Sequence, residues 1–497
     1  MRQLFSGERE RHASVQPMNR EDDQKPAPRG PGENRGFLAG IEEAIQGISS
    51  SALLMLAGTG AFLALLPAWL NYDIISRDGA FQYVPLAQVF LEGRFLEGLM
   101  GEVDPFFPLI IAGIAWLTGL ELELSGRIAS YLAFVLTAVG MYKVGEILFR
   151  DRMVSLLAVL FLITNRQLVD RSIDCLKESL LLCCIIWGNY LVLKGISSID
   201  KKKLSLVLGA LMFFAGGLFR STALVFLCAW LIVWVFHEEK GRLARAALFI
   251  APVCGVLAVW AVNPELPVFR KSYQFGYFFV SSHGAGHILR SGASAVTKFF
   301  STGNPLIILL GLTGLYRYRR DYYSGHLVLV LVMFLLVLTF WVFASDRYFL
   351  APIMWIYPLA AFHTLEIIRS GTMLPRSFAV IALLSCMVLW AHLSFTPPDP
   401  DKLARRDAGE WILSRVGPGH EILSNRERLA FYAKGTGLPL DAFKKAPSSK
   451  VLAIDTGEED GKMLQESLDS QGILPDKRFG SILIYLPRSG DLDETGR

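Results

Sequence analysis

Residues 48–70, ISSSALLMLAGTGAFLALLPAWL, form an uncharged apolar run. As a helix, a run of about 23 residues rises roughly 35 Å, which is enough to cross the ~30 Å hydrocarbon core of a bilayer. The following stretch, IISRDGAFQYVPLAQVFLEGRFLEGLMGEVDPFFPL at residues 74–109, places Asp78, Glu102 and Asp104 ahead of the next apolar run. The sequence therefore predicts a first membrane span with three carboxylates held near one membrane surface.

These three acids are candidates for chemistry. A carboxylate at such a surface can act as a general base or bind a metal ion. The competing interpretation is that they are ordinary solvated acids of a loop, because exposed charge is the rule in proteins.

The composition indicates a protein that crosses the bilayer several times. Of its 497 residues, 52% are hydrophobic and 19% are charged, which is too apolar for a water-soluble chain of this length. The formal net charge is only +4, and Lys and Arg cluster between apolar runs, so they are topology signals rather than a nucleic-acid footprint. We expect membrane lipids around the protein and no nucleic-acid partner.

All six cysteines lie in or beside apolar runs, which argues against a disulfide framework or a zinc ribbon.

The basic connections predict the topology, because short cytoplasmic loops are enriched in Lys and Arg. Residues 1–36 lack hydrophobic periodicity and are expected to form a disordered cytoplasmic tail. Even numbers of crossings between basic connections give about eleven transmembrane helices within residues 37–395, with external loops at 71–127 and 263–304. The apolar segment 106–119 is too short to cross and is expected at the outer surface.

Arg220 separates two apolar pieces, residues 204–219 and 221–236. One helix of their combined length would be about 50 Å long, so a tight hairpin with Arg220 at its outer apex is expected. A charge at that position is costly unless it faces a polar cavity or a partner. The alternative is an arginine that extends to the lipid headgroups.

The chain becomes soluble in character at residue 396. Helical patterns occur at residues 401–415 and 463–470, and strand-like segments at 421–424, 451–455 and 481–486. This alternation predicts a small α/β domain over residues 396–497. The odd number of crossings places that domain outside the cytoplasm, while the N-terminus is cytoplasmic. The predicted fold class is an all-α polytopic membrane protein with a small C-terminal α/β extracytoplasmic domain.

Cations are expected on the same outer side as the acids, among them Lys177, Arg220 and Arg347. Guanidinium groups bind phosphate oxygens through paired hydrogen bonds. A carboxylate about 3 Å from a hydroxyl group can take its proton. Cations with an opposed acid are therefore typical of a transferase site, and the alternative again is arginines that extend to headgroups.

Four motifs carry a resemblance to a known superfamily. They are SRDGAFQYVPLAQVF at residues 76–90, DPFFPLIIAGIAWLTG at 104–119, the R-x-x-S of residues 127–130 before a span ending in LFRDR, and RYFLAPIMWIYPLAA at 347–361. Together they resemble the GT-C membrane glycosyltransferases. Within that superfamily the chain is similar to the protein O-mannosyltransferase and aminoarabinose-transferase-like group, which uses polyprenyl-phosphate sugars. Residues 411–435, WILSRVGPGHEILSNRERLAFYAKG, resemble the start of the external domain in bacterial members.

The resemblance implies a role for the first acid. Asp78 matches the acidic residue of the first external loop, which the family uses as catalytic base or metal partner. The second acid that usually follows it is Gly79 here. Asp104 or Glu102 is then the candidate for the missing acid.

The resemblance also implies a donor phosphate site. Arg347 and Tyr348 match a late Arg-Tyr pair that lies near this phosphate in the family. Arg220 matches a basic residue used for the same phosphate, and Lys177 is a further candidate.

A divalent metal ion (Mg, Mn or Zn) is a candidate cofactor, with Asp104, His283 and His287 as candidate ligands. The two histidines, in SHGAGH, have the spacing that would place both imidazoles on one metal if the segment were helical. The glycines between them argue against a helix, so a histidine pair that binds nothing is the favoured interpretation.

The expected function is that of an integral membrane glycosyltransferase in the plasma (inner) membrane of a prokaryote, acting in cell-envelope glycan biosynthesis. It would move a hexosyl or pentosyl group, with inversion, from a polyprenyl-phosphate donor to a hydroxyl acceptor on a glycan, lipid or protein at the extracytoplasmic face. The alternative is a transporter or flippase of a lipid-linked or small solute. Transporters bind their solutes near the bilayer midplane between repeats, and the absence of a repeat in the sequence favours the enzyme.

Overall fold

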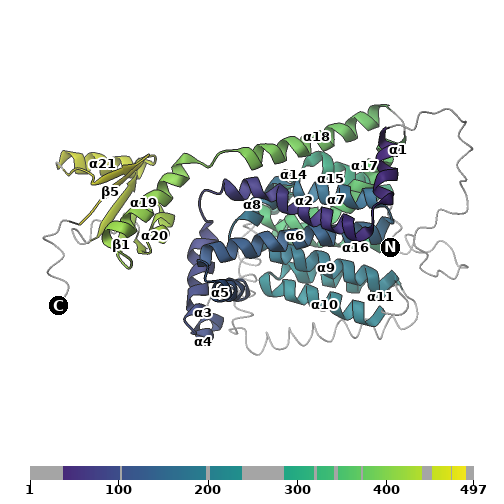
Figure 1. Cartoon of the computed structure of the whole chain (residues 1–497), viewed down its shortest axis with the longest axis horizontal. Helices are drawn as coiled ribbons and strands as arrows, with labels where there is room; N and C mark the ends of the chain where they lie inside the picture. The colour runs from purple at the N-terminus through teal and green to yellow at the C-terminus, as the bar shows by residue number, and fades with distance from the viewer. Residues whose placement is uncertain are drawn as a thin grey trace, which may run out of the picture. The chain divides into compact units, whose positions relative to one another are not determined.

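The computed structural model of the chain describes residues 37–100, 103–197, 202–237, 285–317, 322–340, 345–370, 373–438, 450–471 and 473–487. These residues are mostly helical, with one small sheet near the C-terminus (Figure 1). Five of the described helices are long and apolar enough to span a membrane, or up to seven spans if each of two bent helix pairs counts as one. The helical class with a small sheet is confirmed. The described residues do not reach eleven spans, and residues 238–284 lie outside them.

Two compact units divide the chain. The first unit combines Met1–Leu65, Ser130–Ser172 and Lys177–Leu393, and the second unit combines Leu66–Ala129, Ile173–Leu176 and Ser394–Arg497. The helices α2 (Ser50–Leu70) and α6 (Leu122–Phe149) contribute residues to both units. The C-terminal α/β part therefore belongs to the same unit as the stretch that follows the first span.

The described part of the first unit is helical throughout. Besides parts of α2 and α6 it contains α1 (Phe37–Gly47), α7 (Arg152–Ile163), α8 (Arg166–Ile173), α9 (Glu178–Ser197), α10 (Lys202–Phe219), α11 (Thr222–His237), α14 (Ala285–Thr302), α15 (Pro305–Arg317), α16 (Tyr322–Phe340), the 3₁₀ turn η3 (Asp346–Tyr348), α17 (Leu350–Ser370) and α18 (Met373–Phe395). The hairpin expected around Arg220 is present, because α10 packs against α11 and only Arg220 and Ser221 separate them.

Two sharp bends interrupt the helices of the first unit. The axes of α7 and α8 differ by 65°, and those of the end of α14 and α15 differ by 105°. In each case an asparagine caps the second helix. The side-chain oxygen of Asn165 accepts a hydrogen bond from the N–H of Leu168 at 2.9 Å, and that of Asn304 accepts one from Leu306 at 3.0 Å. Such caps satisfy N–H groups that a helix start would otherwise leave unpaired.

The stretch after the first span is not an extended loop. It forms the π-helical turn η2 (Gly79–Tyr83) and the helices α3 (Val84–Leu91), α4 (Phe95–Met100) and α5 (Phe106–Thr118). The physical reason is helical periodicity. Tyr83, Ala87 and Phe90 recur at spacings of three and four residues, and all three are buried.

Part of the external loop expected at residues 263–304 is also a helix. α14 begins at Ala285 and includes Gly286 and His287, so the described end of the histidine segment is helical, although its glycines argued against a helix. One glycine costs a helix only about 1 kcal/mol relative to alanine. Packing of α14 against α16, with Ala295 and Phe299 buried, outweighs that cost.

The C-terminal sheet has the strand order β2-β1-β3-β5-β4. The strands are β1 (Glu421–Ser424), β2 (Thr436–Leu438), β3 (Val451–Asp455), β4 (Lys477–Phe479) and β5 (Ile482–Tyr485), and the helices around them are α19 (Pro400–Val416), α20 (Glu427–Tyr432) and α21 (Glu459–Ser470). β1 pairs in parallel with β2 and β3, whereas β5 is antiparallel to β3 and β4. The predicted strands at 421–424 and 451–455 coincide with β1 and β3, while β2, β4 and α20 were not predicted.

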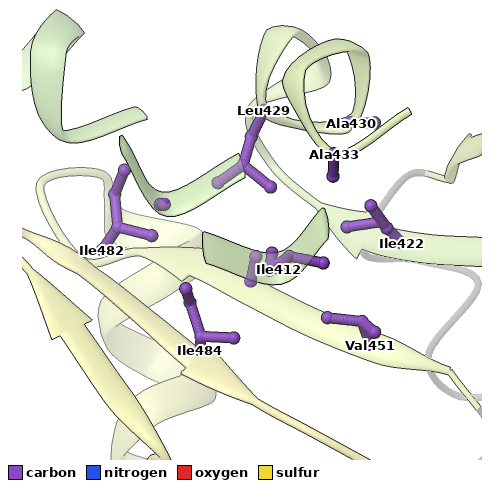
Figure 2. Close-up of a cluster of buried hydrophobic side chains, with 10 residues drawn as sticks. Ile412, Ile422, Leu429, Ala430, Ala433, Val451, Ile482 and Ile484 are labelled. Carbon is purple, nitrogen blue, oxygen red and sulfur yellow. The ribbon is translucent and has the colours of Figure 1, made fainter. Parts of the chain in front are cut away.

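Alternate side chains of the sheet enter two separate cores. Figure 2 shows the first core, where α19 and α20 pack on one face. Its buried members are Ala408, Ile412, Ile422, Leu429, Ala430, Ala433, Val451, Ala453, Ile482 and Ile484. The intervening residues Leu423, Leu452, Ile454, Leu483 and Tyr485 face Leu468 of α21. The period of two along each strand therefore produces a three-layer domain.

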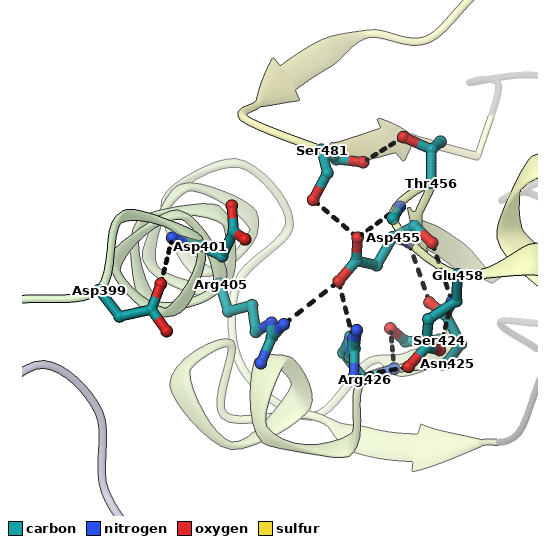
Figure 3. Close-up of polar contacts among 11 residues, drawn as sticks. Asp399, Asp401, Arg405, Ser424, Asn425, Arg426, Asp455, Thr456, Glu458 and Ser481 are labelled. Atoms are coloured by element: carbon teal, nitrogen blue, oxygen red, sulfur yellow. Dashed lines mark hydrogen bonds and ion pairs between the residues drawn. The ribbon is translucent and has the colours of Figure 1, made fainter.

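A buried carboxylate, that of Asp455, forms hydrogen bonds and ion pairs with several elements of this domain. The carboxylate of Asp455, at the end of β3, is 2% exposed. It accepts hydrogen bonds from Arg426 at 2.7 Å, Ser481 at 2.7 Å and the N–H of Gly457 at 2.9 Å (Figure 3). Arg405 of α19 pairs with the same carboxylate at 3.4 Å. Asp455 thereby joins the end of β3 to the start of α20, to the residue before β5 and to α19.

Candidate functional site

The first unit brings together two of the predicted phosphate-binding arginines. The carboxylate oxygen Oε1 of Glu178 lies 3.0 Å from Nη2 of Arg220 and 3.6 Å from Nη1 of Arg347. The guanidinium of Arg220 lies over the ring of Tyr348, 4.8 Å from its centroid. Three segments far apart in sequence thus meet at one buried carboxylate, whose side chain is only 1% exposed.

Close packing of three helices places Arg220. It directly follows α10, and its N–H bonds the carbonyl of Gly216 at 3.0 Å. A Cβ atom at Gly216 would lie 2.9 Å from Cβ of Ala223 in α11 and 3.1 Å from Cβ of Cys184 in α9. Only glycine lets the three helices approach this closely. Arg220 can therefore reach Glu178, the first residue of α9, where a carboxylate also suits the helix dipole.

Arg347 is held by the short turn η3. Thr302, at the end of α14, donates a hydrogen bond to the carbonyl of Asp346 at 3.5 Å. The carbonyl of Thr302 accepts one from the side chain of Asn165 at 3.2 Å, and Asn165 also donates to the hydroxyl of Tyr357 at 2.7 Å. A buried polar chain therefore connects the α7–α8 bend to the turn that carries Arg347.

The electrostatics of this cluster suit an anion. Two guanidinium groups share one carboxylate, so the Arg220–Glu178–Arg347 trio keeps a net positive charge. Lys177, adjacent to Glu178 in the chain, is also buried, with 7% of its surface exposed. The Nη1 atom of Arg220 is buried and has no hydrogen-bond partner within the described part of the chain. Because a buried unpaired donor is costly, this N–H group is well suited to bind a phosphate oxygen.

Sequence reasoning did not identify Glu178. It is the last residue of a polar connection, NRQLVDRSIDCLKE at residues 165–178, that separates two apolar pieces. The available signal was an acid placed at the first residue of an apolar helix, directly after Lys177, because an ionised side chain at such a position needs a partner.

Asp78 lies in the second unit, at the entry to η2. Its backbone is helical (φ −63°, ψ −40°) and its side chain is partly buried. The hydroxyl of Ser76 accepts a hydrogen bond from the N–H of Gly79 at 3.2 Å, and the carbonyl of Ser76 accepts one from Ala80 at 2.9 Å. Ser76 therefore begins the turn that carries Asp78.

Packing explains why Gly79 replaces a second acid. A Cβ atom at Gly79 would lie 2.8 Å from Cγ1 of Ile75 and 3.1 Å from the carbonyl oxygen of Cys175. Neither neighbour leaves room for a larger side chain without displacement. A second acid at this position would therefore require the Ile75 side chain and the backbone at Cys175 to shift.

Of the proposed metal ligands, only Asp104 has a side chain that the structure describes. Asp104 precedes α5 and is partly buried, while Glu102 and His283 lie outside the described residues, as does the side chain of His287. No three His, Cys, Asp or Glu side chains in the described ranges are grouped so that they could hold a metal ion.

A second carboxylate, that of the partly buried Asp174, lies near Asp78 in the second unit. Its Oδ1 atom accepts hydrogen bonds from the hydroxyl of Tyr72 at 2.8 Å, the N–H of Ser76 at 3.2 Å and the N–H of Cys175 at 2.6 Å. Arg127, the arginine of the R-x-x-S motif, stacks on the Tyr72 ring at 3.7 Å. Burial raises the pKa of Asp174 above its ordinary value, and these hydrogen bonds offset the effect only in part.

We expect Asp174→Asn to be increasingly more stable than the wild type as the pH rises. The raised pKa means that the native state favours the protonated acid. The stability that protonated Asp174 contributes to the wild type is therefore complete below about pH 4 and is lost as the pH rises through the folded-state pKa. An amide keeps an accepting oxygen and cannot ionise. Thermal unfolding of both proteins at pH 4 and pH 8 tests this. A difference in midpoint that does not grow with pH would contradict it.

Comparisons with known proteins agree on a fold. The sequence family described as dolichyl-phosphate-mannose-protein mannosyltransferase matches residues 102–267, which is less than half of the chain. No curated protein matches the chain in sequence. The structure is similar to ArnT from Cupriavidus metallidurans bound to undecaprenyl phosphate, with a TM-score of 0.61, 11% identity, and coverage of 88% of this chain and 98% of ArnT.

Two further solved structures are similar. The apo form of the same ArnT has a TM-score of 0.60 at 12% identity, with the same coverage of 88% and 98%. The archaeal oligosaccharyltransferase AglB from Archaeoglobus fulgidus, in complex with an inhibitory peptide and a dolichol-phosphate, has a TM-score of 0.50 at 13% identity, and the match covers 78% of this chain and 64% of AglB. The resemblance expected from the sequence motifs is thereby confirmed at the level of the fold.

Proposed function

We propose that this chain, which shares the fold of ArnT, is an integral membrane glycosyltransferase that transfers a sugar from a polyprenyl-phosphate donor to a hydroxyl acceptor. The observation that carries the proposal is the net positive Arg220–Glu178–Arg347 cluster, in which a buried N–H group of Arg220 has no partner among the described residues. It is supported by the undecaprenyl phosphate bound to ArnT and the dolichol-phosphate bound to AglB.

The cluster would act on the leaving group. As the bond between the sugar carbon and the phosphate oxygen breaks, the polyprenyl phosphate gains a second negative charge. Donors placed in advance around developing charge lower the barrier, and Arg220 and Arg347 provide such donors. Tyr348 limits the movement of Arg220 by lying under its guanidinium.

Asp78 is proposed as the base that takes the proton from the acceptor hydroxyl. The oxygen of that hydroxyl attacks the sugar carbon from the side opposite the phosphate. Such a displacement inverts the configuration of that carbon. A divalent metal ion is a candidate cofactor, with Asp104 as the candidate ligand whose side chain the structure describes.

We also propose a membrane topology for the chain. It has about eleven transmembrane helices within residues 37–395, a cytoplasmic N-terminus and an extracytoplasmic domain at residues 396–497. The site lies at the outer face of a prokaryotic plasma membrane. The acceptor is a glycan, a lipid or a protein.

Arg220→Gln is expected to weaken binding of undecaprenyl phosphate to the full chain in nanodiscs by about tenfold or more, because one charge-assisted hydrogen-bonding group is lost. The matched control is Arg317→Gln, which removes the same charge from an exposed ion pair with Glu366 and should leave binding unchanged. Equal affinity in the wild type and Arg220→Gln would remove the cluster from donor binding.

Asp78→Asn separates binding from chemistry. We expect it to bind undecaprenyl phosphate as the wild type does, but to lose transfer of radiolabelled sugar from polyprenyl-phosphate donors to membrane acceptors, because an amide cannot take a proton. Undiminished transfer at normal protein levels would exclude Asp78 as the base.

A further inference from the structure

The segment between the first span and Asp78 has no regular secondary structure. It comprises residues 71–76 and is called the connecting segment here. The N–H groups of Ile74, Ile75 and Ser76 bond side chains instead of helix or sheet carbonyls, and Ile74 and Ile75 are buried. Because buried N–H and C=O groups need partners, the residues that supply those partners determine the course of the segment.

The C-terminal domain supplies two of these partners and one ion pair. The N–H of Ile75, which is fully buried, donates to the hydroxyl of Tyr432 in α20 at 3.0 Å. Lys402 of α19 forms an ion pair with the carboxylate of Asp73 at 2.9 Å, and Arg406 donates to the carbonyl of Asp73 at 3.3 Å. Both helices that cover one face of the sheet therefore hold the connecting segment.

The held residues lead directly to the acid. Ile75 precedes Ser76, whose N–H donates a hydrogen bond to Asp174. Ser76 begins the turn that carries Asp78. α20 also packs against η2, the turn that continues from Asp78. A shift of Ile75 and Ser76 would therefore shift the backbone of Asp78.

We propose that the C-terminal domain is a positioning element for Asp78, with the hydroxyl of Tyr432 as its main contact. This inference rests on the proposed function, in which Asp78 is the catalytic base. A base must lie within hydrogen-bonding distance of its proton, and a displacement of about 1 Å can cost roughly a hundredfold in rate. Tyr432 is a positioning residue, since it acts through Ile75 and the turn that follows.

The test compares Tyr432→Phe with Tyr485→Phe in the full chain. Both variants lose one phenolic hydroxyl of the same domain, but the hydroxyl of Tyr485 is buried and has no hydrogen-bond partner within the described ranges. In Tyr432→Phe we expect amide hydrogen exchange in residues 71–83 to accelerate about tenfold and kcat for sugar transfer to fall about tenfold, with KM for the polyprenyl-phosphate donor within twofold of wild type. Tyr485→Phe should change none of these.

The outcomes separate this inference from the proposed function. If Asp78→Asn abolishes transfer while Tyr432→Phe changes neither exchange nor kcat, or changes only KM, the positioning role is overturned and the proposed function stands. If Asp78→Asn transfers sugar normally, the proposed function and the inference that rests on it both fail, even where Tyr432→Phe accelerates exchange.

A charge exchange provides the second test, which is needed if Tyr432→Phe does not fold. Lys402→Glu and Asp73→Lys each place like charges at the contact between α19 and the connecting segment. Each single variant should lower kcat, and the double variant should recover it. A double variant no more active than the singles would overturn the positioning role.

Discussion

Glu178→Ala is expected to reduce sugar transfer about a hundredfold and to lower the free energy of unfolding by about 3 kcal/mol. The carboxylate is 1% exposed and sits between Arg220 and Arg347, whose side chains are 11% and 28% exposed. Without it two largely buried guanidinium groups repel each other with no anion between them. They would also lose the orientation that the proposed phosphate contact needs.

The control for this prediction is Glu366→Ala. Glu366 pairs with Arg317 at 2.7 Å, but the arginine is 54% exposed, and exposed pairs contribute about 1 kcal/mol or less. Chemical denaturation and transfer assays on both variants provide the comparison. If the two variants lose equal stability and keep equal activity, Glu178 does not organise the cluster.

Glu178→Gln separates the effect on stability from the effect on sugar transfer. The amide keeps the volume of the side chain and one oxygen that can accept from Arg220, so the loss of stability should be smaller than for alanine. The loss of transfer should remain, because a neutral group cannot hold both arginines by charge.

Asp455→Ala should destabilise the C-terminal domain by about 3 kcal/mol at neutral pH. The substitution leaves Arg405, Arg426 and Ser481 without their shared acceptor. Hydrogen exchange of the β3 amides in the full chain measures the loss. Asp469→Ala removes an exposed aspartate of α21 and is expected to change exchange little.

The effect of Asp455→Ala should shrink in acid. Burial alone would raise the pKa of Asp455, but hydrogen bonds from Ser481, Gly457 and Arg426 outweigh it and lower the pKa below its ordinary value. The stabilisation by this carboxylate is therefore present above about pH 4 and is lost as the pH falls through the folded-state pKa. A difference between variant and wild type that stays constant from pH 7 to pH 3 would contradict this assignment.

The elements with strong local patterns were predictable. The apolar run at 48–70 anticipated α2, and the short strand-like segments at 421–424 and 451–455 anticipated β1 and β3. The three-residue strands β2 and β4 were missed because periodicity over so few residues carries little signal. The first turns after α2 were taken for a loop because polar residues and glycines near Asp78 hid the helical spacing of Tyr83, Ala87 and Phe90.

The candidate site was predictable only in part. Arg220 was identified because a charge between two apolar pieces is costly, and Arg347 because of its motif. That Glu178 joins them could not be read from the sequence, since the three residues lie in separate segments and long-range pairing leaves no periodic pattern. The contacts of Tyr432 and Asp174 with the connecting segment were not predicted for the same reason.

The order of residues along the chain was sufficient to determine a polytopic helical protein with a small α/β end, because hydrophobic length and periodicity are local properties of a polypeptide. Only the tertiary structure decided which charges share a partner and which helices hold the turn of Asp78. Those outcomes depend on close packing, as at Gly216 and Gly79, where one missing Cβ atom lets distant segments meet.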